Sequence, residues 1–422
     1  MIKRLNNNKS KDSFLDKKIL MQKMNEEYGE KEFYSYFLKR KRKEKGLKLE
    51  DVASGICSIS YLSRIENNQV VPDDTSLSLL FERLDLNYNE VKIKREKNIF
   101  EEILKKDLLT IYEDKIEYIN KIIASNAYTT IELDLIVLYG SLLQKNYEEA
   151  KTIMSKQSIN MELFNNTELV FFLYLCARYL YETNQNKKAY SQIKVLTSVS
   201  IKNQFIKAVI LDLAVDILFM MEDHTQLIVF YNLLLQNENS FLFSKKINCH
   251  KLKILYINSK YNYKETINEM EKLKTSISEK EDILIYNHYL MMIHYKNGMY
   301  NKAMEVAKEN MSYIPSLVAY GHISKMIGTE EEKTRFLEYF KITYFSKYQN
   351  NYLDFCNYLN YAIKGESTYH LFNYLKQVIL NDNTLFYDFF LKKISVKELL
   401  ETGLISSKYK ETLRYIIEKK LI

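Results

Sequence analysis

Hydrophobic and polar positions change their pattern along this chain of 422 residues. Between residues 33 and 86, short runs of helical period are broken by turn residues such as Gly46, Gly55 and Pro72. Beyond this part such breaks nearly vanish, and long amphipathic segments such as FFLYLCARYLY continue to the C-terminus. The whole chain has only 9 Gly and 2 Pro, whereas a sheet-rich fold needs turn residues every eight to twelve positions or so. The pattern therefore predicts an all-α protein.

These patterns divide the chain into five predicted segments. They are a flexible arm (1–30), a small helical domain (31–88), connecting helices or a degenerate repeat (89–127), regular repeats (128–327), and degenerate repeats with a C-terminal cap (328–422). The arm is rich in Asn and Lys and lacks sustained periodicity. Met21 and Met24 are alternative starts, so whether residues 1–23 are natural stays open.

The long helical part repeats itself. Five segments align at spacings of 39, 38, 39 and 37 residues on Ala150, Ala189, Leu227, Thr266 and Ala303. Repeats of this length are typical of helix pairs that stack into a solenoid. The copy at residues 286–315 is similar to the tetratricopeptide repeat through Leu290, Tyr295, Gly298, Tyr300, Ala303, Ala307 and Pro315. This resemblance implies a right-handed solenoid of tetratricopeptide-like helix pairs.

The small domain has its turn signals in a fixed order. Gly46 can end a first helix in the left-handed conformation, and Gly55 can make a tight turn after a second helix, LEDVAS. Pro72 and Asp73 can begin a fourth helix by fixing the backbone and capping free N–H groups. In this order, with the third helix between them, residues 37–86 resemble the Xre/Cro-type helix-turn-helix family.

The third helix, residues 58–66, is the predicted DNA-reading element. Leu62 and Ile65 are spaced to pack inward. Four side chains can then face a major groove: Ser58, Ser60, Tyr61 and Arg64. Arg64 has an alternative role, because in this family the Arg-Ile-Glu unit often bridges helices internally.

Positive charge gathers beside this motif. Residues 39–48 carry seven basic residues against one acid, although the net charge of the chain is only +7. Such a patch attracts the phosphate backbone, and a solvated helix face is the alternative. With the third helix it predicts double-stranded DNA as a partner, with phosphate contacts from Arg40, Arg42 and Lys48.

Other classes of function find no support in the sequence. The cysteines lie far apart without metal-ligand spacing: Cys57, Cys176, Cys249 and Cys356. Nucleotide-binding, serine-hydrolase and zinc-protease motifs are missing from the chain. No stretch approaches the roughly 18 apolar residues of a membrane span, and the start lacks the apolar core of a signal peptide. We therefore expect a cytoplasmic protein without metal, cofactor, enzymatic activity or membrane contact.

An Xre-type domain joined to tetratricopeptide-like repeats resembles the Rgg, PlcR and NprR group of peptide-pheromone regulators. The resemblance implies a sequence-specific transcription regulator that forms a homodimer and holds a signalling oligopeptide on the concave side of its repeats. Two alternatives stay open. The repeats could bind a protein such as a phage or plasmid factor, or a phosphorelay protein. The operator, the effector and the direction of regulation are not predicted.

The resemblance also places the effector site. The first helix of each repeat lines the concave face, at positions counted back from the aligned residue. These positions hold Tyr174, Arg178, Tyr181, Asp212, Asp216, Asn258, His288, Met292 and Tyr295. Arg178 or Asn258 would grip the peptide carboxylate or backbone, the acids would meet a peptide cation, and the tyrosines would pack its apolar side chains. The alternative is that Arg178 pairs with Asp212 or Asp216 to satisfy buried charge.

Overall fold

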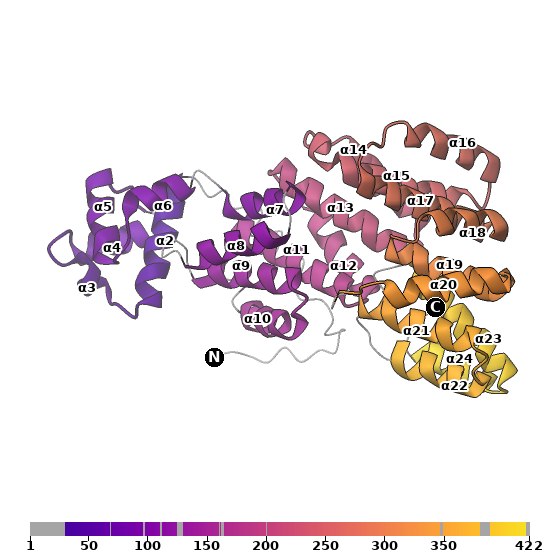
Figure 1. Ribbon diagram of the computed structural model, residues 1–422. Coiled ribbons are helices and arrows are strands. Elements are labelled where there is room, and N and C mark those ends of the chain that lie inside the picture. The colour runs from indigo at the N-terminus through magenta and orange to yellow at the C-terminus, as the bar shows by residue number, and fades with distance from the viewer. Residues whose placement is uncertain are drawn as a thin grey trace. The chain divides into compact units, whose positions relative to one another are not determined.

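The structure is a computed structural model. It describes residues 30–67, 69–95, 98–109, 112–124, 130–159, 161, 164–199, 201–346, 349–379 and 389–418. Every regular element within these ranges is a helix (Figure 1), so the all-α prediction is confirmed. The predicted arm lies outside the described residues except for Glu30.

The chain divides into two compact units. The first comprises Met1–Leu180, Lys187–Leu213 and Asn237–Leu242, and the second comprises Tyr181–Asn186, Ala214–Gln236 and Phe243–Ile422. The five segments predicted from the sequence stay a prediction.

Five helices open the described part of the first unit: α2 (Glu30–Glu44), α3 (Leu49–Ala53), α4 (Ile59–Glu66), α5 (Asp74–Arg83) and α6 (Tyr88–Arg95). They enclose one hydrophobic core, in which Leu62, Ile65 and Phe81 are fully buried. Aromatic rings also connect α2 to α5, because Phe37 stacks on Phe81 with 5.6 Å between the ring centroids. Helix α4 is therefore held against this core by its apolar side chains Leu62 and Ile65, which leaves its opposite side to solvent.

Helix pairs follow in chain order. They are α7 (Ile99–Leu109) with α8 (Tyr112–Ile123), α9 (Thr130–Leu143) with α10 (Tyr147–Ile159), α11 (Asn166–Glu182) with α12 (Asn186–Thr197), and α13 (Gln204–Met220) with α14 (His224–Leu235). The second unit continues with α15 (Ser244–Asn258), α16 (Tyr263–Lys274), α17 (Lys280–Lys296), α18 (Tyr300–Glu309), α19 (Ile314–Ile327) and α20 (Glu330–Ile342). It ends with α21 (Asn350–Ile363), α22 (Thr368–Tyr374), a π-helical turn (Leu375–Ile379), α23 (Phe389–Ile405) and α24 (Tyr409–Glu418).

The repeat predicted from the sequence has a structural counterpart. Each of the five aligned residues is the fourth residue of the second helix in its pair, and all five are buried: Ala150, Ala189, Leu227, Thr266 and Ala303. Four of the five pairs also share a residue in the left-handed conformation five positions earlier: Lys145, Asn184, Glu222 and Gly298, with φ between 55° and 74°. A left-handed residue after a helix end reverses the chain by a Schellman-type turn. The aligned positions therefore mark the same place in each helix pair.

Close packing continues beyond the aligned repeats. Pro315 lies in the first turn of α19, where a missing N–H costs no hydrogen bond. Helix α19 packs against α18, α20 and α21. At Gly321 the approach to α20 is so close that an added Cβ would lie 2.4 Å from the Phe336 ring. This glycine therefore sets the spacing of the two helices.

Candidate functional site

The predicted turn signals of the small domain act as expected. Gly46 and Gly55 both have left-handed φ values, of 68° and 75°. The Ser58 hydroxyl caps α4 by accepting a hydrogen bond of 3.1 Å from the Tyr61 N–H. Asp73 caps α5 in the same way, through the Ser76 N–H at 2.8 Å. The local sequence therefore defines the turn before α4, through Gly55 and Ser58, and the start of α5, through Asp73.

Arg42 takes part in an internal ion pair instead of pointing to solvent. Its Nε and Nη2 donate to the two carboxylate oxygens of Glu66 at 2.6 and 2.7 Å, and its Nη1 donates to the Leu47 carbonyl at 2.8 Å. The Arg42 and Glu66 side chains are 12% and 4% exposed. The hydrogen bond with Glu66 raises the pKa of Arg42. The bridge that sequence reasoning offered to Arg64 is thus made by Arg42, and Arg42 is placed as a structural residue.

Arg40 also contacts an acid. Its Nη1 lies 3.2 Å from Oε1 of Glu168, which belongs to α11 and is buried. Burial raises the pKa of the Glu168 carboxyl, and Arg40 opposes that shift. Nearby, Oε1 of Glu44 accepts a hydrogen bond of 2.8 Å from the Thr130 N–H. Arg40 and Glu44 therefore connect α2 to the helices that follow within the first unit, and their side chains are engaged there.

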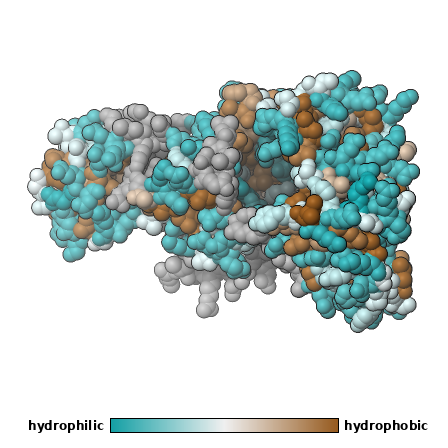
Figure 2. Space-filling view, viewed as in Figure 1, coloured by the Kyte–Doolittle hydropathy of each residue, from teal (hydrophilic) through white to brown (hydrophobic). Residues whose placement is uncertain are grey.

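The side of α4 that faces away from the core carries the remaining candidates. Ser60 and Arg64 are exposed, as predicted, whereas Tyr61 is half-buried against the core. Lys48, at the start of α3, is 79% exposed and lies 3.5 Å from Glu50. The face of this domain in Figure 2 shows hydrophobic side chains among hydrophilic ones. Contact of these residues with DNA stays a prediction.

Sequence reasoning left out two members of this exposed face. Ile59 is 50% exposed at the first position of α4, and Asn67 is exposed just after its end. The amide oxygen of Asn67 accepts a hydrogen bond of 2.9 Å from Lys39 Nζ. Ile59 and Asn67 flank Ser60 and Arg64 at helical spacing, so completing the helical periodicity would have found both.

Three of the predicted effector positions lie in the first unit. Tyr174 is buried, with its ring centroid 6.4 Å from that of Phe171. The guanidinium carbon of Arg178 lies 5.5 Å from the centroid of the Tyr139 ring. Asp212 is half-buried. Arg178 therefore has a cation-π contact inside the protein.

Asp216 and Asn258 occupy different environments in the second unit. Asp216 forms an ion pair with Lys253 and lies 3.6 Å from His250 Nδ1. Against the effect of burial, these two groups lower the pKa of Asp216. Asn258 is exposed at the end of α15, and Tyr181, in the last turn of α11, is half-buried. The carboxylate of Asp216 thus already has a cation beside it.

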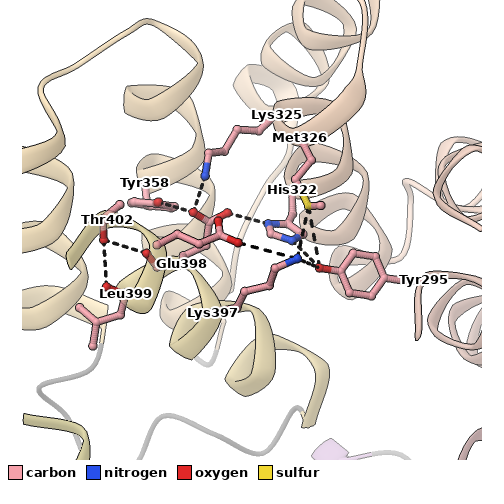
Figure 3. Close-up of polar contacts among 10 residues, drawn as sticks. Tyr295, His322, Lys325, Met326, Tyr358, Lys397, Glu398, Leu399 and Thr402 are labelled. Atoms are coloured by element: carbon pink, nitrogen blue, oxygen red, sulfur yellow. Dashed lines mark hydrogen bonds and ion pairs between the residues drawn. The ribbon is translucent and has the colours of Figure 1, made fainter. Parts of the chain in front are cut away.

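Of the three predicted positions on α17, His288 and Tyr295 contact α23, and Met292 is buried. His288 is also buried, and its ring lies 6.0 Å from that of Phe390 on α23. The Tyr295 hydroxyl lies 2.9 Å from His322 Nε2 and accepts a hydrogen bond of 3.2 Å from Lys397 Nζ (Figure 3). This contact between α17 and α23 joins residues about 100 positions apart and was not predicted from the sequence.

A buried carboxylate holds α23 in place. Oε1 of Glu398 lies 2.9 Å from His322 Nδ1 (Figure 3). Its Oε2 accepts a hydrogen bond of 2.6 Å from the Tyr358 hydroxyl and forms an ion pair with Lys325. Against the effect of burial, His322 and Lys325 lower the pKa of Glu398 to about 2. Helices α19, α21 and α23 are therefore joined by one ionised group.

Among the described residues, no cluster of three or more His, Cys, Asp or Glu side chains is arranged to hold a metal ion. No helix in the described part of the chain is long and apolar enough to cross a membrane.

Known proteins resemble this chain in two ways. Residues 38–91 match the helix-turn-helix family model. A stretch of 36 residues is 61% identical to the transcriptional activator NprA of Geobacillus stearothermophilus, but it covers only 8% of this chain and 9% of that activator.

The likeness in structure is broader. The apo form of the quorum sensor NprR from B. thuringiensis aligns with a TM-score of 0.51 over 78% of this chain and 99% of that chain. At 15% sequence identity this likeness shows the fold alone. The chain therefore has an N-terminal helix-turn-helix domain followed by helical repeats of the fold found in NprR, as its resemblance to that group of regulators predicted.

Proposed function

We propose that this protein is a transcription regulator that binds specific duplex DNA through its helix-turn-helix domain. The observation that carries the proposal is the exposed side of α4, which includes Ser60 and Arg64. The helix itself is held in place by the buried core and by the Ser58 cap. Exposed side chains of such a helix contact base edges in the major groove, and Ser60 lies in its first turn, where such contacts are most common. Arginine pairs with guanine, and serine can bond to several bases. The similarity of a 36-residue stretch of the chain to a transcriptional activator supports the proposal.

Salt-dependent binding of the full-length protein to a selected duplex tests this function. Arg64→Ala should cost about 1–3 kcal/mol and relax the preference at one base pair. Lys48→Ala should weaken binding to all sequences alike and lower the salt slope by about one, because it removes a phosphate contact. Ser78→Ala, on an exposed and uncharged position of α5 in the same domain, serves as a control. A full-length protein without salt-dependent affinity for any duplex would disprove the proposal.

We further propose that the repeats sense a short signalling peptide. The fold shared with a quorum sensor supports this class of effector. Asn258, which is exposed, and Arg178, which is half-buried, keep polar groups suited to a peptide backbone or carboxylate. The Arg178 contact is proposed for the first unit and the Asn258 contact for the second.

A short secreted pro-peptide encoded in the neighbouring DNA would supply the candidate effector, and calorimetry with a synthetic heptapeptide of that sequence tests its binding. Arg178→Ala and Asn258→Ala should weaken binding while both variants stay folded, although Arg178→Ala also removes the contact with the Tyr139 ring and should lower the melting temperature slightly. Lys188→Ala, on the exposed side of α12, should leave binding unchanged. Normal peptide affinity in both variants, or a loss of stability alone, would exclude these two contacts. Copurification of a response regulator in place of peptide binding would favour the protein-partner alternative.

A homodimer completes the proposed function. One helix-turn-helix makes few base contacts, and regulators of this kind gain specificity by binding two half-sites related by twofold symmetry. Light scattering at micromolar concentration, with and without DNA, measures this state. A strictly monomeric protein under both conditions would exclude the dimer.

A further inference from the structure

Lysine side chains from two helices of the second unit lie over one group of aromatic rings. Nζ of Lys296, the last residue of α17, lies 4.2 Å from the centroid of the Tyr256 ring, and Nζ of Lys393 on α23 lies 4.5 Å from that of Phe389. These two rings contact each other edge to face, with 5.7 Å between their centroids. Since ring faces attract cations, the rings hold two ammonium groups at one place.

The partners of Lys296 differ from those of another partly buried lysine in this unit. Lys253 forms an ion pair with Asp216. Lys296 is half-buried, and its Nζ donates to two backbone carbonyls, those of Tyr256 at 2.8 Å and Ile257 at 3.3 Å. Carbonyls accept these hydrogen bonds but carry no net charge. The hydrogen bonds of Lys296 therefore do not balance its positive charge.

Three lysines, Lys296, Lys392 and Lys393, share one carboxylate, and we call them the lysine cluster. Lys393 forms an ion pair of 3.1 Å with Glu222, which lies in the turn between α13 and α14, and the other two are within electrostatic reach of the same acid. Burial, together with Lys393 and Lys260, lowers the pKa of Lys296 to about 8, and Glu222 opposes this shift. At neutral pH the Lys296 side chain is therefore still mostly a cation. One acid does not balance the cluster, and a second anion would.

Part of the cluster is accessible from solvent. The Lys393 and Glu222 side chains are 44% and 51% exposed. Such exposed ion pairs are weak, so an incoming anion can replace Glu222 at little cost. Asn258 is exposed and directly follows Ile257, whose carbonyl accepts from Lys296. An uncharged amide that can bind a peptide backbone therefore lies beside the ammonium groups.

We propose that the lysine cluster binds the C-terminal carboxylate of the effector peptide, with Asn258 bound to the peptide backbone beside it. This inference rests on the proposed peptide effector and names the part of the peptide that is recognised. Every unmodified peptide carries this carboxylate, and ammonium groups bind it through charge-assisted hydrogen bonds. Capture of a terminal carboxylate is a recurring mode of peptide recognition. Because α23 supplies two of the three lysines, the peptide would bind with this helix in place.

Peptides with two different ends test the site. The immobilised full-length protein is offered a pool of synthetic heptapeptides of mixed sequence. The retained peptides, identified by mass spectrometry, are then synthesised with a carboxylate end and with an amide end. In calorimetry the carboxylate form should bind at least about tenfold more tightly, because the amide end cannot form the charge-assisted hydrogen bonds.

Variants on the exposed side of the cluster should change this preference in opposite directions. Lys393→Met should reduce the preference for the carboxylate form, because it removes one ammonium group. Glu222→Gln should increase it, because it removes the carboxylate that competes for the lysines. Lys308→Met, the same change on the exposed side of α18, should leave it unchanged. Circular dichroism checks that each variant is folded, and a merely structural role of Glu222 would not produce tighter binding.

The outcomes separate this inference from the proposed effector. Equal affinity of the two peptide forms for the wild-type protein, or an unchanged preference in Lys393→Met, would overturn the carboxylate site and leave the peptide effector in place. A protein that retains no peptide from the pool would exclude the peptide effector and this site together. Binding of inorganic phosphate by such a protein would assign the lysine cluster to a different anion.

Discussion

Arg42→Ala should destabilise the helix-turn-helix domain itself. The guanidinium bonds both oxygens of Glu66 and the carbonyl of Leu47, so it joins α2 to α4 and to the turn before α3. Removing it leaves the Glu66 carboxylate, only 4% exposed, without its cation. A residue that contacts only phosphate would have no such effect on the free protein.

The expected size follows from burial. Removing one partner of a buried ion pair costs about 3–5 kcal/mol, because the other charge stays desolvated and unpaired. Since the Arg42 side chain keeps some exposure, at 12%, we expect the lower end, about 3 kcal/mol. That is a large part of the stability of a small domain, about 5–15 kcal/mol. It corresponds to an opening constant on the order of 100 times larger.

Hydrogen exchange of the full-length protein, followed in peptides from α2 and α4, measures local opening. Arg42→Ala should speed exchange in both helices on the order of 100-fold. Glu66→Gln should also speed it, but less, because no bare charge remains. Lys48→Ala is the matched control, since its side chain is 79% exposed: it should leave exchange unchanged while it weakens DNA binding and lowers the salt slope. Unchanged protection in Arg42→Ala, with a salt slope lowered by one, would refute the structural role and restore the phosphate contact.

Two further predictions concern the second unit. Gly321→Ala should lower stability by about 1–3 kcal/mol, because the new Cβ would lie 2.4 Å from the Phe336 ring, whereas Gly140→Ala, whose nearest contact would be 3.5 Å, should be neutral or stabilising in urea unfolding. Glu398 has a pKa lowered to about 2, so its carboxylate stabilises the fold above its unfolded pKa of about 4.3, and that contribution is lost as pH falls towards 2. The difference in unfolding free energy between wild type and Glu398→Gln should therefore shrink between pH 6 and pH 2.5, and an equal difference at both pH values would contradict this.

Local signals made the helix-turn-helix predictable. Gly46, Gly55 and the Ser58 cap each act on a backbone only a few residues away, so the sequence alone defines their geometry. The partner of Arg42 lies 24 positions away, and the choice between Arg42 and Arg64 depends on how α2 crosses α4. The charge pattern of residues 39–48 does not contain that crossing, so it could not identify Arg42 as the partner of Glu66.

The phase of the repeats was predictable for a similar reason. A residue buried where two helices meet must recur at the same position, and Leu227 and Thr266 fill it as well as alanine does. The surroundings of each first helix were not predictable, because they depend on elements far along the chain. Lys253 beside Asp216 is one case, 37 positions distant. Helical spacing finds the side of a helix, but not what lies against it.

The contact between α17 and α23 limits where a peptide can bind in the second unit. Phe390 lies against His288 and Tyr295, with ring centroids 6.0 and 5.3 Å apart, so the chain itself already provides the aromatic partner that a ligand would. Moving α23 away would strip the buried Glu398 of His322 and Lys325, at the high cost of an unpaired buried charge. Binding of a peptide would have to offset this cost if the peptide replaced α23. We therefore expect a peptide to bind at positions that α23 leaves open. Asn258, exposed at the end of α15, meets that condition, and His288 does not.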